Sequence, residues 1–285
     1  MAKYTTADIK ALREKTGAGM LDVKKALEEA DGDTEKAIEI IRVKGLKGIA
    51  KREGRSASAG LIAAKVVGAP DGTDGADGQV GVLVEVNAET DFVAKNQKFL
   101  DYAEQVLTAA LDSGATDADA LAEVEVDGST VKELTDGMQA VIGEKIVVRR
   151  VGRLEADKIE LYLHRTNPDL PAQVGVLVGT DAKAAEVAHD VAMHIAAYSP
   201  EYATRDDVPA EVVDKERAIA EETTRAEGKP EKAIPKIVEG RLSGFFKENV
   251  LVDQAFAKDP KTTVGKVVEA TGGELTGFVR FRVGA

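Results

Sequence analysis

The side chains of this sequence that could ligate a metal ion are carboxylates and histidines, and the clearest carboxylate pattern lies in residues 69–78. There, Asp71, Asp74 and Asp77 recur every third position in APDGTDGADG. A calcium loop of the EF-hand type has a different spacing and a bidentate glutamate at a fixed offset, and neither occurs here. Aspartate and glycine at this density are typical of turns, so the segment is predicted to be a flexible hairpin loop.

The three histidines are His164, His189 and His194. His189 and His194 lie five positions apart, which is the wrong spacing for two metal ligands on one helix face, and no H-E-x-x-H motif occurs. The sequence also lacks cysteine, a phosphate-binding G-x-x-x-x-G-K-[ST] loop and a G-x-S-x-G nucleophile motif. We therefore expect no catalytic residues, no metal site and no cofactor, and we expect the histidines to be surface or packing residues.

An apolar pair at a polar junction is the remaining candidate. The segment NAETDFVAKNQK, residues 87–98, joins a predicted strand to a predicted helix, and Phe92 and Val93 interrupt its polar residues. One interpretation places Phe92 on the apolar face of that helix, because Phe99 follows seven positions later. The other takes Phe92 and Val93 as an exposed interface anchor on the first turn of a helix capped by Thr90 or Asp91. The residue pattern alone favours neither.

The elements that must position this junction belong to a chain of 285 residues with 44% hydrophobic residues and a net charge of −12. Such a chain can hold two or more domains, and its negative charge argues against nucleic acid as the main ligand. The basic segment RVKGLKGIAKREGR, residues 42–55, is expected to be a solvated linker, with an RNA contact as the alternative. Without a signal-peptide core or a membrane-length apolar run, a cytoplasmic protein is expected.

Three short helices are predicted at the start of the chain. Thr5 and Asp8 form a capping box for the first helix, and Asp33 caps the third. The second helix is expected to run through Leu21, Val23, Leu27 and Ala30. The tight loop GAGML between the first two helices is expected to leave Met20 and Leu21 near the surface.

An internal repeat organises the middle of the chain. The sequence QVGVLV occurs at residues 79–84 and again at residues 173–178. Each copy follows another apolar stretch and precedes a helical one, so a unit of strand, loop, strand and helix is used twice. Two further strand candidates are KIVVRRVGRL and TGFVRFRV. Two related α+β subdomains, each with a small antiparallel sheet, are the economical architecture.

Residues 201–249 break this pattern with two long helical stretches joined at Gly228, Lys229 and Pro230. Their apolar stripes are thin and comprise Val212, Ile219, Ile234, Val238 and Leu242. Helices with so little apolar surface are expected to form an antiparallel hairpin that projects as an arm. Such an arm is expected to serve in self-association or in a secondary contact with a partner.

Several segments resemble one protein family. TDFVAKN, residues 90–96, is similar to the signature of the elongation factor Ts family, the nucleotide exchange factors of elongation factor Tu. LREKTGAGMLDVKKALEEADGD resembles that family's N-terminal domain, which is similar to ubiquitin-associated (UBA) domains. Further matches follow in the family's order: GEKIVVRR, AMHIAA, VVDKE, GKPEKAIPKIVEGRL, TVGKVV and GFVRF. The resemblance covers essentially the whole chain.

The resemblance implies a non-enzymatic exchange factor that binds elongation factor Tu in its GDP-bound and nucleotide-free states. In the family, the Asp-Phe pair inserts between two partner helices beside the Mg²⁺ site, which here implicates Asp91 and Phe92, flanked by Thr90 and Val93. The resemblance also implies partner contacts for a second group of residues: Arg13, Met20, Leu21 and His164.

Together, the residue patterns and the resemblance predict an α+β protein with five parts. These are a UBA-like domain (1–45), a basic linker (46–58), a first core subdomain (59–140), a second one (141–200 with 250–285) and a helical hairpin of dimerisation type (201–249). Two other function classes would give different results. An adaptor would bind a partner through residues 1–50 alone, and an enzyme using its carboxylates would turn over a substrate without a partner protein.

Overall fold

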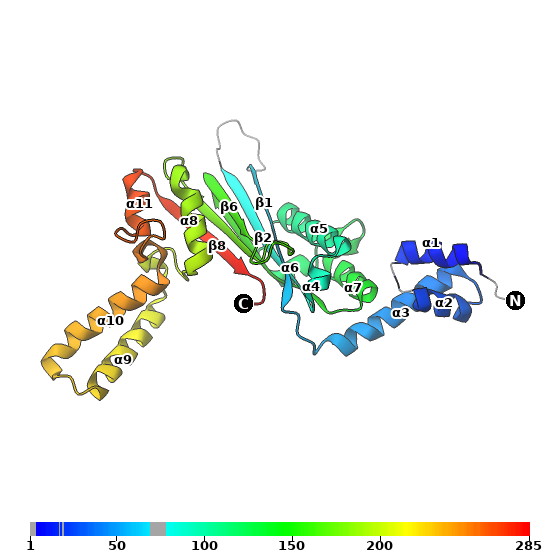
Figure 1. The fold of residues 1–285 in the computed structure, drawn as a ribbon, viewed down its shortest axis with the longest axis horizontal. Coiled ribbons are helices and arrows are strands. Elements are labelled where there is room, and N and C mark those ends of the chain that lie inside the picture. The colour runs from blue at the N-terminus through cyan, green and yellow to red at the C-terminus, as the bar shows by residue number, and fades with distance from the viewer. Residues whose placement is uncertain (1–3, 17, 19, 69–77) are drawn as a thin grey trace.

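The computed structural model describes residues 4–16, 18, 20–68 and 78–285. The molecule is elongated: the N-terminal helices lie at one end, two small sheets occupy the middle, and a pair of long helices lies at the other end (Figure 1). The predicted loop with Asp71, Asp74 and Asp77 falls outside the described residues. Within the described part, no helix has the length and apolar character that crossing a bilayer requires.

The first three helices are α1 (Thr6–Thr16), α2 (Met20–Glu29) and α3 (Thr34–Arg52). Both predicted caps are confirmed. The Asp8 amide donates to Thr5 Oγ1 while the Thr5 amide donates to the Asp8 carboxylate, and Asp33 accepts from two amides of the first turn of α3. A small apolar core unites the helices: Leu12, Ala18, Val23, Ala26, Leu27, Ala30 and Ala37.

Helix α3 is longer than the sequence pattern indicated. Residues 46–52, expected to be linker, continue the helix up to Arg52. Lysine and arginine are good helix formers, and the basic charge of this stretch therefore does not interrupt the helix. Packing also supports it, because Gly45 approaches α7 (Val131–Ile142) so closely that a Cβ there would lie 2.6 Å from the Cβ of Ala140.

The first sheet has the order β1-β2-β5 and is antiparallel. Its strands are β1 (Ala59–Gly68), β2 (Gln79–Ala88) and β5 (Ile146–Ala156). Between β2 and β5 lie α4 (Asp91–Ala94), α5 (Gln97–Ser113), α6 (Ala118–Ala122), the short pair β3 (Glu125–Val126) and β4 (Ser129–Thr130), and α7. Apolar residues of these helices, including Phe99 and Val106 of α5, pack on one face of β2.

The second sheet repeats this plan with the order β6-β7-β8, again antiparallel. Its strands are β6 (Lys158–His164), β7 (Val174–Thr180) and β8 (Leu275–Arg282), and helices α8 (Ala185–Tyr198) and α11 (Val264–Ala270) pack on one face. The repeated QVGVLV segments fall on β2 and β7, the central strands of the two sheets. The α+β class with small antiparallel sheets is therefore confirmed.

The two sheets also pack face to face, which the sequence did not indicate. Ile62 and Leu83 of the first sheet form one buried cluster with Leu177 of the second. Side chains alternate along a strand, so Val82 and Val84 of β2 face the helices while Leu83 faces the other sheet. The result is a four-layer arrangement in which both central strands are buried on both faces.

Helices α9 (Ala210–Ala226) and α10 (Ile234–Asn249) pack against each other at the end opposite α1 (Figure 1). Three residues of the predicted stripe are buried: Ile234, Val238 and Leu242. The assignment of Ile219 was wrong, because its side chain is 46% exposed and Ala220 is buried instead. Where two helices approach closely, the smaller residue occupies the contact and the larger neighbour turns to solvent.

His194 is a packing residue at the centre of the second core. It lies on α8, is completely buried, and shares a hydrogen bond between Nε2 and Gln254 Oε1 at 2.8 Å. The amide of Ala257 donates to its Nδ1 at 3.2 Å, so both ring nitrogens are used by the neutral imidazole. Burial lowers the pKa of His194.

Because of this lowered pKa, the protein should lose stability as the pH falls below about 6.5, the ordinary value for histidine. The unfolded chain then binds a proton at His194 that the folded chain does not, so mild acid favours unfolding. Urea melts between pH 8 and 5 measure the effect, and His194→Gln should flatten the dependence. His189→Gln, on the exposed side of the same helix, is the matched control. An unchanged slope in His194→Gln would contradict this assignment.

Candidate functional site

The junction between β2 and α4 lies beside the loop that leads from α7 into β5. In the antiparallel register, Ala88 at the end of β2 is opposite Ile146 at the start of β5. The residues just beyond the sheet, Glu89 and Lys145, therefore face each other. The Lys145 amide donates to Glu89 Oε1 at 2.6 Å, and Arg55 pairs with the same carboxylate at 3.3 Å. The donation from Lys145, with a smaller contribution from Arg55, holds the pKa of Glu89 below its ordinary value.

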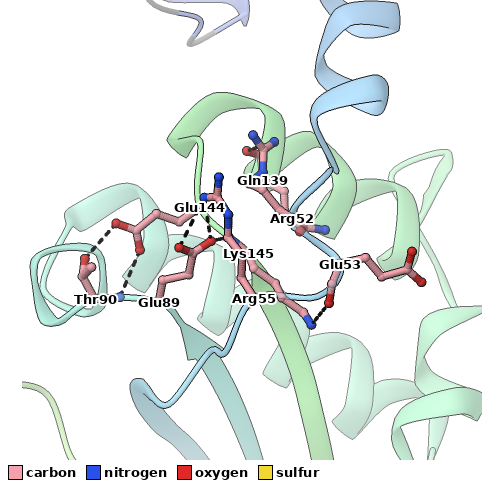
Figure 2. Close-up of polar contacts among 8 residues, drawn as sticks. All are labelled: Arg52, Glu53, Arg55, Glu89, Thr90, Gln139, Glu144 and Lys145. Carbon is pink, nitrogen blue, oxygen red and sulfur yellow. Dashed lines mark hydrogen bonds and ion pairs between the residues drawn. The ribbon is translucent and has the colours of Figure 1, made fainter. Parts of the chain in front are cut away.

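Glu144 binds Thr90, the residue that follows Glu89 in the junction. Its two carboxylate oxygens accept from the Thr90 amide at 3.0 Å and from the Thr90 hydroxyl at 2.8 Å. Figure 2 shows the Glu144 carboxylate pointing at Thr90 from the opposite loop. Two consecutive residues of one loop thus hold two consecutive residues of the other, and the start of α4 is fixed on both its main chain and its side chain.

Phe92 is exposed on this fixed helix start. Its side chain is 78% accessible, whereas Phe99 is fully buried. The interpretation that put both rings on one helix face is therefore wrong. The helix stops after Ala94, and Asn96 starts α5 by accepting a hydrogen bond from the amide of Lys98. Lys95 Nζ lies 5.1 Å from the centre of the Phe92 ring, a cation–π contact on an otherwise open face.

The other three residues of the predicted anchor differ from one another. Asp91 is exposed, Thr90 is half-buried, and Val93 is buried at 8% exposure within the core of the first sheet. Successive residues of a helix point about 100° apart, so Phe92 and Val93 cannot share one exposed face. Thr90 occupies the N-cap position, but its side chain makes no capping bond, and its hydroxyl donates to Glu144. Of the two predicted cap residues, Thr90 therefore occupies the N-cap position without the capping bond, and Asp91 does not occupy it. Val93 anchors the turn that carries Phe92 in the core.

The remaining predicted site residues lie apart from this junction. Arg13 is exposed on α1, and Met20 and Leu21 are 61% and 71% exposed on the first turn of α2. The prediction that Met20 and Leu21 lie near the surface is therefore confirmed. His164 is exposed at the end of β6, where its Nδ1 lies 3.2 Å from the hydroxyl of Tyr162. Figure 1 shows α1 and α2 well separated from α4, with α3 running between them.

Glu144, Glu89 and Lys145 were missed by sequence reasoning as contributors to the site. Glu144 lies 54 residues from Thr90 in the sequence, and Lys145 lies 56 residues from Glu89. A charged residue that follows a helix gives no local signal that it bonds to a residue so distant in the sequence. The order β1-β2-β5 was the missing information, because it alone places the two loops side by side.

The geometry indicates a binding surface. No group of three or more potential metal ligands exists among the described residues. A groove of about 600 Å³ lies between the N-terminal helices and α7, and none of the predicted site residues lines it. Its lining includes Thr16 at the end of α1, Ile38 and Ile41 of α3, and Ala140 of α7. The junction presents an exposed aromatic ring on a turn that is held by buried residues and hydrogen bonds. Such a ring is typical of an interface anchor.

Comparison with known proteins gives consistent results. The sequence model of a family described as "Elongation factor TS" matches residues 89–285. A curated elongation factor Ts of Beutenbergia cavernae is 67% identical to this chain, and the comparison covers 100% of both proteins. Those of Micrococcus luteus and Kineococcus radiotolerans are 62% and 56% identical, again over the full length of both chains.

Proposed function

Because this chain belongs to the elongation factor Ts family, we propose that it binds elongation factor Tu and promotes GDP release from it, so that GTP can bind. On this proposal it engages both the GDP-bound and the nucleotide-free partner and has no catalytic site of its own. It requires no cofactor and no nucleic acid, and it acts in the cytoplasm, where elongation takes place.

The exposure of Phe92 carries this proposal. The Phe92 ring is 78% exposed, so it loses contact with water when it enters a pocket of a partner. Because the turn that carries it is already rigid, little conformational entropy is lost on binding. The turn itself is held by buried Val93 and Ala94 below it and by Glu144 beside it. A ring on a mobile loop would have to be ordered on binding, and part of its binding energy would be lost.

The proposed mechanism is displacement of a packed element in the partner. Phe92, with Asp91 beside it, enters between two partner helices near the Mg²⁺ that neutralises the phosphates of GDP. Packed elements move in discrete steps, so the insertion dislodges the metal and uncovers the phosphate charge, and GDP leaves. Thr90 and Val93 hold the inserting turn.

Phe92 alone does not supply enough free energy for this. A 10⁴-fold shift toward the open partner corresponds to about 5.5 kcal/mol of differential binding, and one anchor residue provides roughly 2–4 kcal/mol. The proposal therefore includes further contacts through Arg13, Met20, Leu21 and His164. The coupling is reciprocal, so incoming GTP expels the factor by the same free energy.

The direct test is release of labelled GDP from purified elongation factor Tu, with and without this protein. Acceleration that saturates with factor concentration supports the proposal. An unchanged release rate at saturating factor would reject it. Turnover of a substrate without elongation factor Tu would instead favour an enzyme, and partner binding by residues 1–50 alone would favour an adaptor.

The proposed contact surface on α2 comprises Met20 and Leu21. The double variant Met20→Ala/Leu21→Ala should raise the dissociation constant for nucleotide-free elongation factor Tu about 10- to 100-fold, since it removes two apolar contacts. Its free energy of unfolding should change by less than about 1 kcal/mol, because both side chains are exposed. Titration calorimetry and urea melts give the two quantities.

Val23→Ala is the matched control on the same helix. Val23 is completely buried in the small helical core, so this change should destabilise the protein by about 1–3 kcal/mol. A collapse of the unfolding midpoint in the double variant, comparable to the control, would show that Met20 and Leu21 are core residues.

The division of the chain is part of the proposal. Residues 1–45 act as a UBA-like contact domain, joined through the basic segment 46–58 to two core subdomains, which the sequence divided into 59–140 and 141–200 with 250–285. Because β5 (Ile146–Ala156) pairs with β2 in the first sheet, we place the boundary between the two subdomains after Ala156. Residues 201–249 serve as a hairpin for self-association or a secondary contact. The ion pairs Arg217–Glu239 and Arg241–Glu227 between α9 and α10 support a hairpin that holds its own shape. Sedimentation of the full chain at micromolar concentration measures the association, and a monomer throughout would remove the dimer role.

A further inference from the structure

The polar cluster around Glu144 bears on how the direction of the inserting turn is set. Helix α4 has only four residues, and a helix of that length is not stable by itself. The hydroxyl at its N-cap position, which ordinarily bonds to an amide of the first turn, makes no such bond here. The hydroxyl and the amide of Thr90 both donate to Glu144.

We propose that Glu144 is a positioning residue for nucleotide exchange: its carboxylate fixes Thr90 and thereby sets the direction in which α4 presents Phe92 to the partner. This inference rests on the proposed function. Two observations carry it. The carboxylate uses both of its oxygens on Thr90, and Phe92 is two residues further along the same turn.

The neighbouring contacts make Glu144 a fixed support. The next residue, Lys145, donates its amide to Glu89 at 2.6 Å and its ammonium group to the main-chain oxygen of Glu53 at 2.5 Å. Arg52 Nη2 reaches the carbonyl of Gln139 at 3.1 Å. Figure 2 shows the two Lys145 bonds reaching the loop between α7 and β5, one from the junction and one from the residue after α3, while the Arg52 bond ties α3 to α7. The loop is therefore tied on two sides, and Glu144 cannot follow Thr90 if α4 rotates.

A positioning role has a kinetic signature. Arg13, Met20 and Leu21 would still hold the complex if Phe92 were misdirected, so the affinity should change little. The insertion itself would be less often productive. We expect Glu144→Ala to lower the maximal GDP release rate roughly tenfold, as loss of two hydrogen bonds to one carboxylate predicts. The factor concentration at half-maximal rate should change by less than about threefold.

Stopped-flow release of a fluorescent GDP analogue from elongation factor Tu measures both quantities with the full-length chain. The decisive comparison is a double-mutant cycle with Phe92→Ala. If Glu144 acts through Phe92, Glu144→Ala should slow release in the wild-type background and have no further effect in the Phe92→Ala background. If the two substitutions slow release by independent factors, so that the double variant shows their product, the inference is overturned, because Glu144 would then act on the partner independently of Phe92.

Further variants separate positioning from folding and from charge. Thr90→Val removes only the hydroxyl and should give a smaller loss of the maximal rate even if Glu144→Ala folds poorly, and Glu144→Gln should give an intermediate one. Glu53→Ala is the charge control, because the Glu53 side chain points away from the cluster while its main-chain oxygen stays in place (Figure 2). If Glu53→Ala lowered the maximal release rate as much as Glu144→Ala does, the effect would be explained by the loss of one negative charge, and the inference would be overturned.

Failure of this inference can be told apart from failure of the proposed function. If Phe92→Ala slows release while Thr90→Val and Glu144→Ala keep the full maximal rate, the exchange function stands and Glu144 has no positioning role. If the wild-type chain does not accelerate release at all, the proposed function fails and the positioning role fails with it.

Discussion

Phe92→Ala is expected to slow GDP release from elongation factor Tu roughly a hundredfold, which corresponds to a loss of about 2.7 kcal/mol of interaction in the distorted state of the partner. The reason is that the ring is the exposed part of the proposed inserting turn. Binding to nucleotide-free partner should fall less, because the contacts of the N-terminal helices are intact in this variant.

The same substitution should leave the protein almost as stable as before. The ring is 78% exposed, so its removal should change the free energy of unfolding by about 1 kcal/mol or less. Phe99→Ala is the matched control, since it removes the same side chain from a fully buried position on α5. That variant should lose about 3–5 kcal/mol.

Urea melts and stopped-flow GDP release on both variants decide between anchor and core. A Phe92→Ala protein that unfolds as readily as Phe99→Ala, yet exchanges at the wild-type rate while folded, would eliminate Phe92 as the anchor. Asp91→Ala probes the neighbouring charge separately. Since Asp91 is exposed and does not occupy the N-cap position, a slower release in that variant would reflect its interaction with the partner.

Glu85→Ala should be the most destabilising change to a charged side chain in the first sheet, at about 3 kcal/mol. Glu85 lies on β2 and is completely buried. Its carboxylate accepts from Arg150 Nε at 2.6 Å, from Asn87 Nδ2 at 3.1 Å and from the amide of Gly284 at 3.0 Å. It therefore joins β2 to β5 and to the end of the chain that follows β8.

The loss comes from leaving these donors without an acceptor in a buried place. Arg150 keeps some hydration, because its side chain is 35% exposed, and the value therefore lies at the lower end of the range of about 3–5 kcal/mol for broken buried pairs. The midpoint of thermal unfolding should fall by about 2–4 °C per kcal/mol, as measured by calorimetry.

Glu155→Ala is the control for this prediction. Glu155 lies on β5 and pairs with Arg153, but its side chain is 67% exposed, so the change should stay within about 0.5 kcal/mol. Equal midpoints for the two variants would mean that the Glu85 cluster contributes no more than a surface ion pair.

The helices and strands were largely readable from the chain because their signals are local. A capping box spans four residues, as with Thr5 and Asp8, and strand alternation is visible within one segment, as in residues 79–84. The repeat located both central strands before their pairing was known. Resemblance then supplied the family, which the matches over the full length of the chain confirm.

Errors arose where a contact distant in sequence outweighed the local pattern. Residues 46–52 are helical because α3 packs on α7, and Ile219 is exposed because Ala220 fits the contact with α10. The seven-residue spacing of Phe92 and Phe99 indicated one helix, whereas Asn96 begins a new one. Periodicity assumes an unbroken helix and therefore cannot detect such a boundary.

The sequence by itself determined the element types, the family and the candidate anchor segment, because these depend on neighbouring residues. Only the tertiary structure decided that Phe92 faces solvent while Val93 is buried, and that Glu144 holds Thr90. The first depends on the packing of α4 in the core of the first sheet. The second depends on the pairing of β2 with β5, whose facing ends, Ala88 and Ile146, are separated by 57 intervening residues. The free energy of that pairing is shared among many contacts across the sheet, so no short segment encodes it.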